Sequence, residues 1–296
     1  MTATEVAPVP APLAPEPPSP RKAHRRSWDE APRWQIYLPL SVYLLFTLVP
    51  FYWILLFALR PDGSTSLVPW PMTFDHFQKV WTERDFGIYF KNSVQVGVVT
   101  LVMTTLVALA GGYALARFDF RAKRAFMLAL LCSQFVPGAL LLVPLFRIFA
   151  ELRMINSLSS VIIAETVFQL PLSMILISGF IRNVPYSLEE AAWVDGCNRF
   201  AAFRIVVLPL LRPGLIAVGS FAFVHAWNHF LFALMFLSDQ SKQTIPVGLN
   251  TLMSADSVDL GALAAGGIIA AVPVVIVFAF IQKWLITGFS AGAVKG

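Results

Sequence analysis

The sequence predicts an all-α protein that crosses a lipid bilayer six times. Hydrophobic residues make up 57% of its 296 residues and charged residues only 13%, whereas ordinary soluble domains carry about 25% charged residues. A soluble globule of this length cannot hide so much apolar surface from water. The apolar residues also fall in stretches long enough to cross a bilayer as helices, which takes about 20 residues each.

The six predicted spans are separated by more polar loops and cover approximately residues 36–59, 93–115, 125–147, 158–181, 214–237 and 262–286. Glycine pairs occur in the second and the sixth span, and the third and fourth contain Pro137, Pro144 and Pro171. Membrane spans tolerate such residues where neighbouring helices satisfy the freed backbone carbonyls.

Residues 1–33 are predicted to form a disordered cytoplasmic tail. They include eight prolines and end in a basic cluster formed by Arg21, Lys22, Arg25, Arg26 and Arg33. Proline-rich sequence without apolar periodicity cannot offset its ordering entropy. A cleavable signal peptide is not expected, because the apolar stretch that follows is too long and lacks a small-residue cleavage site. The chain is therefore divided into this tail and a six-span domain over residues 34–296.

The distribution of positive charge predicts the orientation of the spans. With the N-terminus inside, 15 Lys and Arg residues lie on the cytoplasmic side and seven on the other. Cytoplasmic loops carry the excess of positive charge in membrane proteins. Both termini are therefore expected in the cytoplasm. Because the basic cluster of the tail lies next to a span, we expect it to set the orientation of that span and not to bind nucleic acid.

The longest cytoplasmic loop, about residues 185–213, is predicted to form two short helices. Ser187 and Glu190 have the spacing of a capping box at the start of the first helix, and Gly196 can adopt the left-handed conformation that ends it. Asn198 is the expected cap of the second helix, which presents Phe200, Phe203, Val207 and Leu208 on one side and ends at Pro209 and Pro213. From these features alone, a partner-binding projection and a solvated loop both remain open.

The same loop resembles the EAA motif of ABC-importer permeases. That motif reads Glu-Ala-Ala, three residues, Gly, nine residues, Ile, one residue, Leu-Pro, and this chain matches it with Val206 in the Ile position and with Glu190, Ala191, Ala192, Gly196, Leu208 and Pro209. Further resemblance to the family lies at residues 50–53, Tyr113–Arg117, 226–228 and 291–296. Together these segments resemble the shorter permease of maltose-type sugar importers over about residues 34–296.

The resemblance implies a permease subunit that holds no cofactor itself, with ATP and Mg²⁺ bound by partner ATPases. The implied partners are a second, non-identical permease, two cytoplasmic ATPase subunits and an extracytoplasmic solute-binding protein. The implied location is a bacterial or archaeal cell membrane. The loop would sit in a cleft of an ATPase, and the residues implied in this coupling are Glu189, Glu190, Ala191, Ala192, Asp195, Gly196, Leu208 and Pro209.

Motifs for chemistry within the chain itself are absent from the sequence. It contains no Gly-x-x-x-x-Gly-Lys-Ser/Thr phosphate loop and no His-Glu-x-x-His zinc motif. His225 and His229 share a helix face at i, i+4 spacing, but no carboxylate or cysteine accompanies them in sequence, so we expect no metal site there. Cys132 and Cys197 are expected to be unpaired thiols.

Polar residues inside the predicted spans are the candidates for the substrate path. They are Glu165, Gln169, Trp227, Asn228 and His229. A carboxylate within a span normally faces the bundle interior or a wet cavity, and a sugar needs hydrogen-bonding groups beside aromatic faces. Hydrogen bonding between helices is the alternative role for the same residues.

Three other function classes remain to be separated from a sugar importer. A secondary transporter or channel would also have six basic-inside spans but would need no coupling loop. A membrane-embedded enzyme would need convergent catalytic groups, which Glu165 alone does not supply. Within the ABC class, the cargo could instead be a polyamine, an amino acid or a polyol phosphate, and the choice of a di- or oligosaccharide rests on resemblance alone.

Overall fold

The computed structural model describes the backbone of residues 32–253 and 258–293, and side chains as far as Gln282 with the exception of Arg33. The chain divides into two units, residues 1–49 and 50–296. All regular secondary structure in the described ranges is helical, so the predicted fold class is confirmed. Residues 1–31 of the predicted tail and residues 294–296 of the C-terminal motif lie outside the described residues.

The described part of the first unit is the beginning of α1 (Arg33–Leu59), which continues into the second unit. The helices of the second unit follow in chain order: α2 (Asp75–Glu83), α3 (Phe86–Arg117), α4 (Lys123–Ser133), η2 (Gly138–Leu141), α5 (Leu142–Glu151), α6 (Leu158–Arg182), α7 (Ser187–Val194), α8 (Arg199–Ala202), η3 (Phe203–Val207), α9 (Leu208–Leu210), α10 (Arg212–Asn228), α11 (Leu231–Phe236), η4 (Gln240–Lys242), α12 (Ile245–Thr251) and α13 (Leu260–Ala293).

Four of the six predicted spans are single helices long and apolar enough to cross a membrane. They cover Trp34–Leu59, Phe86–Arg117, Leu158–Arg182 and Leu260–Gln282. The second of these begins seven residues before the predicted start at residue 93. The bundle of the second unit is built on α3, which packs against both α6 and α10, while α10 also packs against α13.

The other two predicted spans are not continuous helices. The predicted span 125–147 is broken before Pro137, and the helices on either side are bent by 95°. Proline lacks the amide hydrogen that would continue the helix, and it restricts the residue before it. The predicted span 214–237 is divided at His229, whose extended backbone (φ −75°, ψ 119°) separates α10 from α11.

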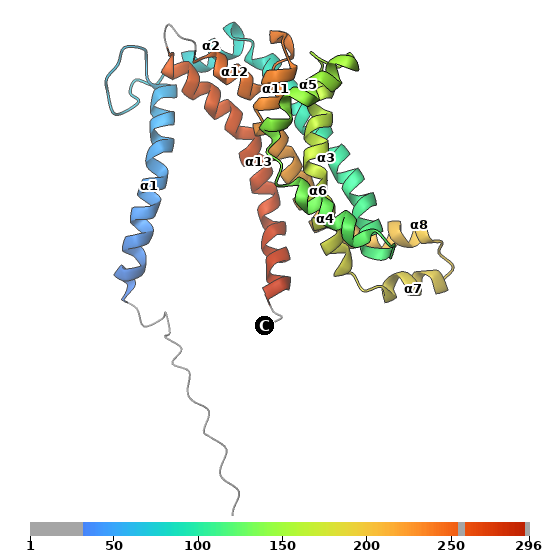
Figure 1. The fold of residues 1–296 in the computed structure, drawn as a ribbon. Helices are drawn as coiled ribbons and strands as arrows, with labels where there is room; N and C mark the ends of the chain where they lie inside the picture. Colours follow the sequence, from blue (N-terminus) through green and yellow to red (C-terminus); the bar gives the residue numbers. More distant parts are fainter. Residues whose placement is uncertain (1–31, 254–257, 294–296) are drawn as a thin grey trace, which may run out of the picture. The chain divides into compact units, whose positions relative to one another are not determined.

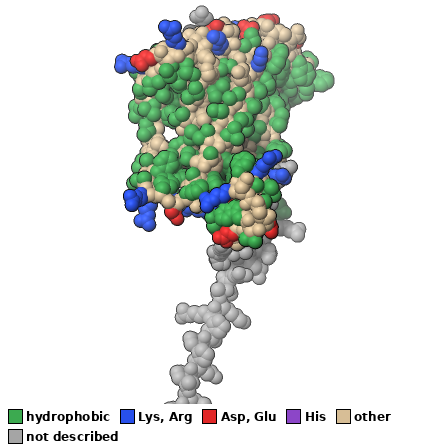
Figure 2. Space-filling model, turned by 90° about the vertical axis from the view of Figure 1, so that its right-hand side faces the viewer, with side chains coloured by type: hydrophobic (Ala, Val, Ile, Leu, Met, Phe, Trp, Pro, Cys, Tyr) green, Lys and Arg blue, Asp and Glu red, His purple; other side chains and the backbone are tan. Residues whose placement is uncertain are grey.

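The two ends of the bundle in the second unit carry different elements. The short helices α7 and α8 lie at the same end as the C-terminal part of α13, and α2, α5, α11 and α12 lie at the other end (Figure 1). On the face drawn in Figure 2, hydrophobic side chains form a broad band, and Lys, Arg, Asp and Glu gather at its two ends. This distribution fits an apolar belt in the bilayer and charged ends in water.

An ion pair fastens the end of the bundle that lies away from α7. Lys79 Nζ in α2 lies 2.7 Å from Asp259 Oδ2, and the hydrogen bond and charge of Asp259 raise the pKa of Lys79 above its ordinary value. Asp259 Oδ1 also accepts a hydrogen bond from the Ala262 amide (2.9 Å). This carboxylate therefore joins α2 to the first turn of α13.

Close contact between α3 and α6 depends on glycine at position 112. A Cβ atom added there would lie 2.7 Å from Ile177 Cγ2 and 3.1 Å from the backbone nitrogen of Ser178. A flexible side chain could move away from an added Cβ atom, but the backbone of α6 cannot. Gly179, on α6 itself, has no atom within 4 Å of its added Cβ.

We therefore predict that Gly112→Val destabilises the protein by about 1–3 kcal/mol, the usual penalty for overpacking a tight core. The check is the thermal unfolding midpoint of the purified protein in detergent, with Gly179→Val as the control on the open side of α6. Equal midpoints for the two variants would contradict a close α3–α6 contact at this glycine.

Candidate functional site

The first helix of the loop over residues 185–213 begins where the sequence predicts, but it is not capped as predicted. Helix α7 starts at Ser187, its N-cap residue is Tyr186, and no side chain caps it. The amides of Leu188 and Glu190 bond instead to the carbonyls of Pro185 and Tyr186 (3.2 and 3.1 Å). The capping-box prediction is wrong because Pro185 and Tyr186 already form the first turn, which places Ser187 inside the helix.

The end of α7 and the start of α8 confirm the sequence prediction. Gly196 has φ +89°, and the amide of Cys197 bonds to the carbonyl of Ala192 (2.9 Å), which is the Schellman arrangement for a helix end. Asn198 Oδ1 then accepts a hydrogen bond from the Ala201 amide (2.8 Å) and caps α8. The turn between the two helices is therefore defined by a glycine and an asparagine.

The second helix of the loop ends beside Pro209, as predicted. Helices α8, η3 and α9 follow without a break, and the chain changes direction at Leu211 by 73°. The continuous helical run that begins at Arg199 ends at Leu210, one residue after Pro209. Pro213 lies in the first turn of α10, where a missing amide hydrogen disturbs no helical bond, so it starts a helix in place of ending one. Phe200 is 72% exposed, so it is not part of the buried side that includes Val207.

A buried ion pair holds this loop against α3. Glu189 is fully buried, and its carboxylate accepts hydrogen bonds from Arg117 Nε (2.6 Å) and from the Tyr113 hydroxyl (2.7 Å). Arg117 Nη2 also donates to the carbonyl of Val184 (2.9 Å). Glu189 therefore positions the loop and does not itself form its surface. The sequence showed Tyr113 and Arg117 as part of a matching segment but did not reveal their partner.

The exposed side of the loop contains most of the remaining predicted coupling residues. Glu190, Ala191, Asp195, Gly196 and Pro209 are exposed, Leu208 is half-buried, and Ala192 is buried. Two large apolar side chains that the sequence did not assign to coupling, Val194 (88% exposed) and Phe200, accompany them. The loop thus offers a surface with two carboxylates and exposed apolar side chains.

A second candidate site lies between α6 and α10. Glu165 on α6 is fully buried, and its Oε2 lies 3.0 Å from Nδ1 of His225 while its Oε1 lies 2.7 Å from Nδ1 of His229. The two imidazole rings stack with centroids 5.3 Å apart. The sequence missed that a carboxylate accompanies this histidine pair, because Glu165 is 60 residues away in the chain.

The other candidates for the substrate path occupy different surroundings. Trp227 is 2% exposed, packs against Phe90 and Phe223, and donates its Nε1 hydrogen to the Ala270 carbonyl (3.1 Å). It belongs to the α10–α13 core and offers no ring face to a cavity in this structure. Gln169 lies on α6, and its side chain is largely buried, with 9% exposed.

Three polar side chains open into a shallow hollow of about 350 Å³ beside this cluster. The hollow is lined by Phe221, Val224, His225, Asn228 and His229. Asn228 is exposed and donates to the Val224 carbonyl (2.9 Å). Glu165 is fully buried and does not line the hollow, but it contacts the two histidines that do.

Comparison with known proteins places most of the chain in one family. Residues 108–290 match the family described as "binding-protein-dependent transport system inner membrane component". The diacetylchitobiose uptake system permease DasC of Streptomyces coelicolor is 36% identical over 253 residues, which cover 83% of this chain and 91% of that protein. The trehalose transport system permease SugB of Mycobacterium tuberculosis is 31% identical over 85% of this chain and 93% of that protein.

The fold is also similar to a solved structure. A chain of a bacterial ABC transporter that imports the acidic polysaccharide alginate superposes with a TM-score of 0.71 and 20% identity over 85% of this chain and 97% of that one. A second structure of the alginate transporter, in complex with a periplasmic protein that holds an alginate pentasaccharide, superposes with a TM-score of 0.65 and 15% identity over 87% of this chain and 96% of that one.

The buried pair yields a direct prediction. Glu189→Gln leaves the Arg117 guanidinium without a counter-charge, and removing one partner of a buried pair costs about 3–5 kcal/mol. We expect a lower thermal midpoint and faster proteolysis of the 185–213 loop. The double variant Arg117→Met with Glu189→Met should recover most of the lost stability because neither charge then remains buried.

Glu190→Gln is the control, since it alters an exposed carboxylate on the neighbouring residue. If Glu189→Gln and Glu190→Gln melt at the same temperature and are cleaved at the same rate, the pair does not hold the loop.

Proposed function

The chain belongs to the family of inner-membrane components of binding-protein-dependent transport systems, and on this premise we propose that it is the permease subunit of an ATP-driven importer of di- or oligosaccharides. The observation that carries the proposal is the similarity to the diacetylchitobiose and trehalose permeases over more than four-fifths of this chain. This similarity favours a sugar over the polyamine, amino-acid and polyol-phosphate alternatives, and it favours an ABC permease over a secondary transporter.

The 185–213 loop is proposed to couple ATP hydrolysis on partner subunits to movement of the bundle. The partners would be two cytoplasmic ATPases, which bind ATP and Mg²⁺, a second and non-identical permease, and an extracytoplasmic solute-binding protein. The exposed loop surface around Glu190 and Asp195 would contact the ATPase. The ion pair of Glu189 with Arg117 would transmit the loop's displacement to α3 as a rigid body.

The proposed orientation places the loop and both termini in the cytoplasm. The bundle end that carries α7 and α8 also carries the C-terminal part of α13 (Figure 1). The sequence near that end is rich in Arg and Lys, at positions 117–124 and 182–212. Cytoplasmic loops carry this excess of positive charge.

The hollow beside Glu165 is proposed as the surface of this subunit that contacts the sugar. Glu165 accepts the hydrogen on Nδ1 of His225, and this fixes the tautomer that carries hydrogen on Nδ1. In a neutral imidazole the other nitrogen, Nε2, then keeps a free lone pair. Such a nitrogen accepts hydrogen bonds from hydroxyl groups, which are the donors that a neutral sugar offers.

The function is tested by transport into proteoliposomes that contain the assembled complex. With ATP inside and a loaded binding protein outside, we expect uptake of at least one member of a panel of labelled di- and oligosaccharides. Gly196→Pro should insert and assemble but lose most uptake, because proline cannot adopt the φ of +89° at this turn. Gly267→Ala, with open space around its Cβ, is the control. Failure of every sugar with an active ATPase would refute the assignment.

The sugar-contacting role of the hollow is tested by protection of a cysteine. In a background without Cys132 and Cys197, a cysteine at Asn228 should be labelled more slowly by a water-soluble thiol reagent when the sugar is present. Replacing His225 and His229 with Asn keeps a donor near the position of Nδ1 but removes Nε2. Loss of one hydrogen bond is worth about 0.5–1.5 kcal/mol, so we expect half-maximal protection to require roughly two- to tenfold more sugar.

A cysteine at Val98, which lines a separate apolar hollow between α3, α10 and α13, serves as the matched control and should show no protection. Equal protection of the cysteines at Asn228 and Val98, or protection that the histidine changes do not affect, would show that this hollow does not contact the sugar.

A further inference from the structure

The segment between α1 and α2 forms an apolar loop without charged side chains. Residues 63–74 contain no Asp, Glu, Lys or Arg, and exposed carboxylates at Asp62 and Asp75 flank them. Five large apolar side chains of this 63–74 loop have more than half of their surface exposed, namely Leu67, Val68, Trp70, Met72 and Phe74. A group of exposed apolar side chains of this size indicates an interaction surface.

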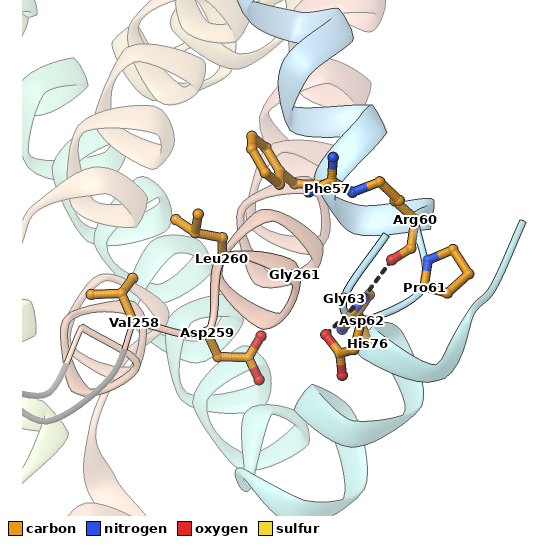
Figure 3. A pocket seen from close by; sticks show the side chains of 10 residues that line it. All are labelled: Phe57, Arg60, Pro61, Asp62, Gly63, His76, Val258, Asp259, Leu260 and Gly261. Carbon is orange, nitrogen blue, oxygen red and sulfur yellow. Dashed lines mark hydrogen bonds and ion pairs between the residues drawn. The ribbon is translucent and has the colours of Figure 1, made fainter. Parts of the chain in front are cut away.

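Hydrogen bonds fasten both ends of the 63–74 loop to the end of α1 that lies away from α7. The amide of Thr73 donates to the carbonyl of Leu59 (2.8 Å), and Nε2 of His76 donates to the carbonyl of Arg60 (3.0 Å; Figure 3). The Arg60 guanidinium donates in turn to the carbonyl of Ser66 (3.3 Å). The loop therefore leaves α1 and returns to it at the same level.

Between these two fastened ends, the tip of the loop runs back along α1. The hydroxyl of Tyr52 donates a hydrogen bond to the carbonyl of Leu67. Tyr52 lies within the first membrane span, Trp34–Leu59, and seven residues before its end, which is about 10 Å at 1.5 Å per residue. Side chains of a helix also tilt toward its N-terminus, here away from Leu59. The tip is therefore held beside the span and below its charged end.

The backbone of the tip needs few hydrogen bonds from water. Two of its residues, Pro69 and Pro71, have no amide hydrogen. Three amides donate within the loop: Ser66 to Ser64 Oγ (3.3 Å), Val68 to Ser66 Oγ (3.1 Å) and Trp70 to the Val68 carbonyl (2.8 Å). A backbone beside hydrocarbon must satisfy its polar groups within the protein, so these bonds suit a loop that enters the membrane.

We propose that the 63–74 loop inserts its exposed apolar side chains into the boundary between lipid headgroups and acyl chains at this end of the bundle. Tryptophan is enriched at this boundary because its ring is apolar and its N–H is polar, and Trp70 is 76% exposed. A protein partner in the water phase would meet the charged end of the bundle, whereas the tip lies below that end. The proposal rests on the membrane location of the chain and not on its cargo.

The test measures the depth of nitroxide spin labels on the assembled complex in lipid nanodiscs, in a background without Cys132 and Cys197. Labels on Val68→Cys and Trp70→Cys should collide more often with dissolved oxygen, which concentrates in hydrocarbon, than with a water-soluble nickel chelate. A label on Asp75→Cys, the matched control at an exposed flanking residue, should show the reverse order. Values at Val68 and Trp70 equal to those at Asp75 would place the loop in water, and few collisions with either reagent would show that protein covers it. Either result would overturn the proposal.

A second pair of variants tests what holds the tip at this depth. Tyr52→Phe removes the hydrogen bond to the Leu67 carbonyl, so the label at Val68 should become more mobile and its ratio of oxygen to nickel collisions should fall. Tyr43→Phe, at another exposed tyrosine of α1, is the control and should leave mobility and ratio unchanged. The same ratio in both variants would count against the proposal, because the contact with α1 would then not set the depth of the loop.

Discussion

The ion pair between Glu189 and Arg117, with the Tyr113 hydroxyl, is the interaction on which the arrangement of this subunit depends. It is formed where the short helix α7 meets the last turn of α3. Burying two charges is expensive unless each is paired and hydrogen-bonded, and here both carboxylate oxygens and two guanidinium nitrogens have partners. Such a pair fixes the position of the loop relative to α3, because movement of one without the other would leave a charge buried alone.

The two helices that leave the loop also carry the polar cluster inside the bundle. Helix α6 enters the loop at Arg182 and bears Glu165, about 26 Å away at 1.5 Å per residue. Helix α10 leaves it at Arg212 and bears His225, about 20 Å away by the same measure. A rigid displacement of the loop would therefore move both halves of the cluster. Gly112 lets α3 pack closely against α6. We therefore expect α3 and α6 to move together.

The sequence predicted most of the local structure correctly where a single residue type determines it. Gly196 and Asn198 end and begin helices as expected, because the left-handed conformation and the side-chain cap depend on few neighbours. Ser187 failed as a cap because the two residues before it already continue the helix. The helix expected to end at Pro209 and Pro213 does end beside Pro209, whereas Pro213 starts α10, because the missing amide is harmless in a first turn.

By itself, the sequence determined the class of protein, the approximate spans and the position of the two-helix loop over residues 185–213. In lipid, every backbone N–H and C=O group needs a hydrogen-bond partner within the protein, so apolar stretches of this length have few alternatives to a helix. Only the tertiary structure decided which polar side chains meet. Glu189 with Arg117, Glu165 with the histidine pair, and Lys79 with Asp259 are each separated by many residues in the chain. Their pairing follows from which helices pack together, and hydropathy and local spacing carry no information about it.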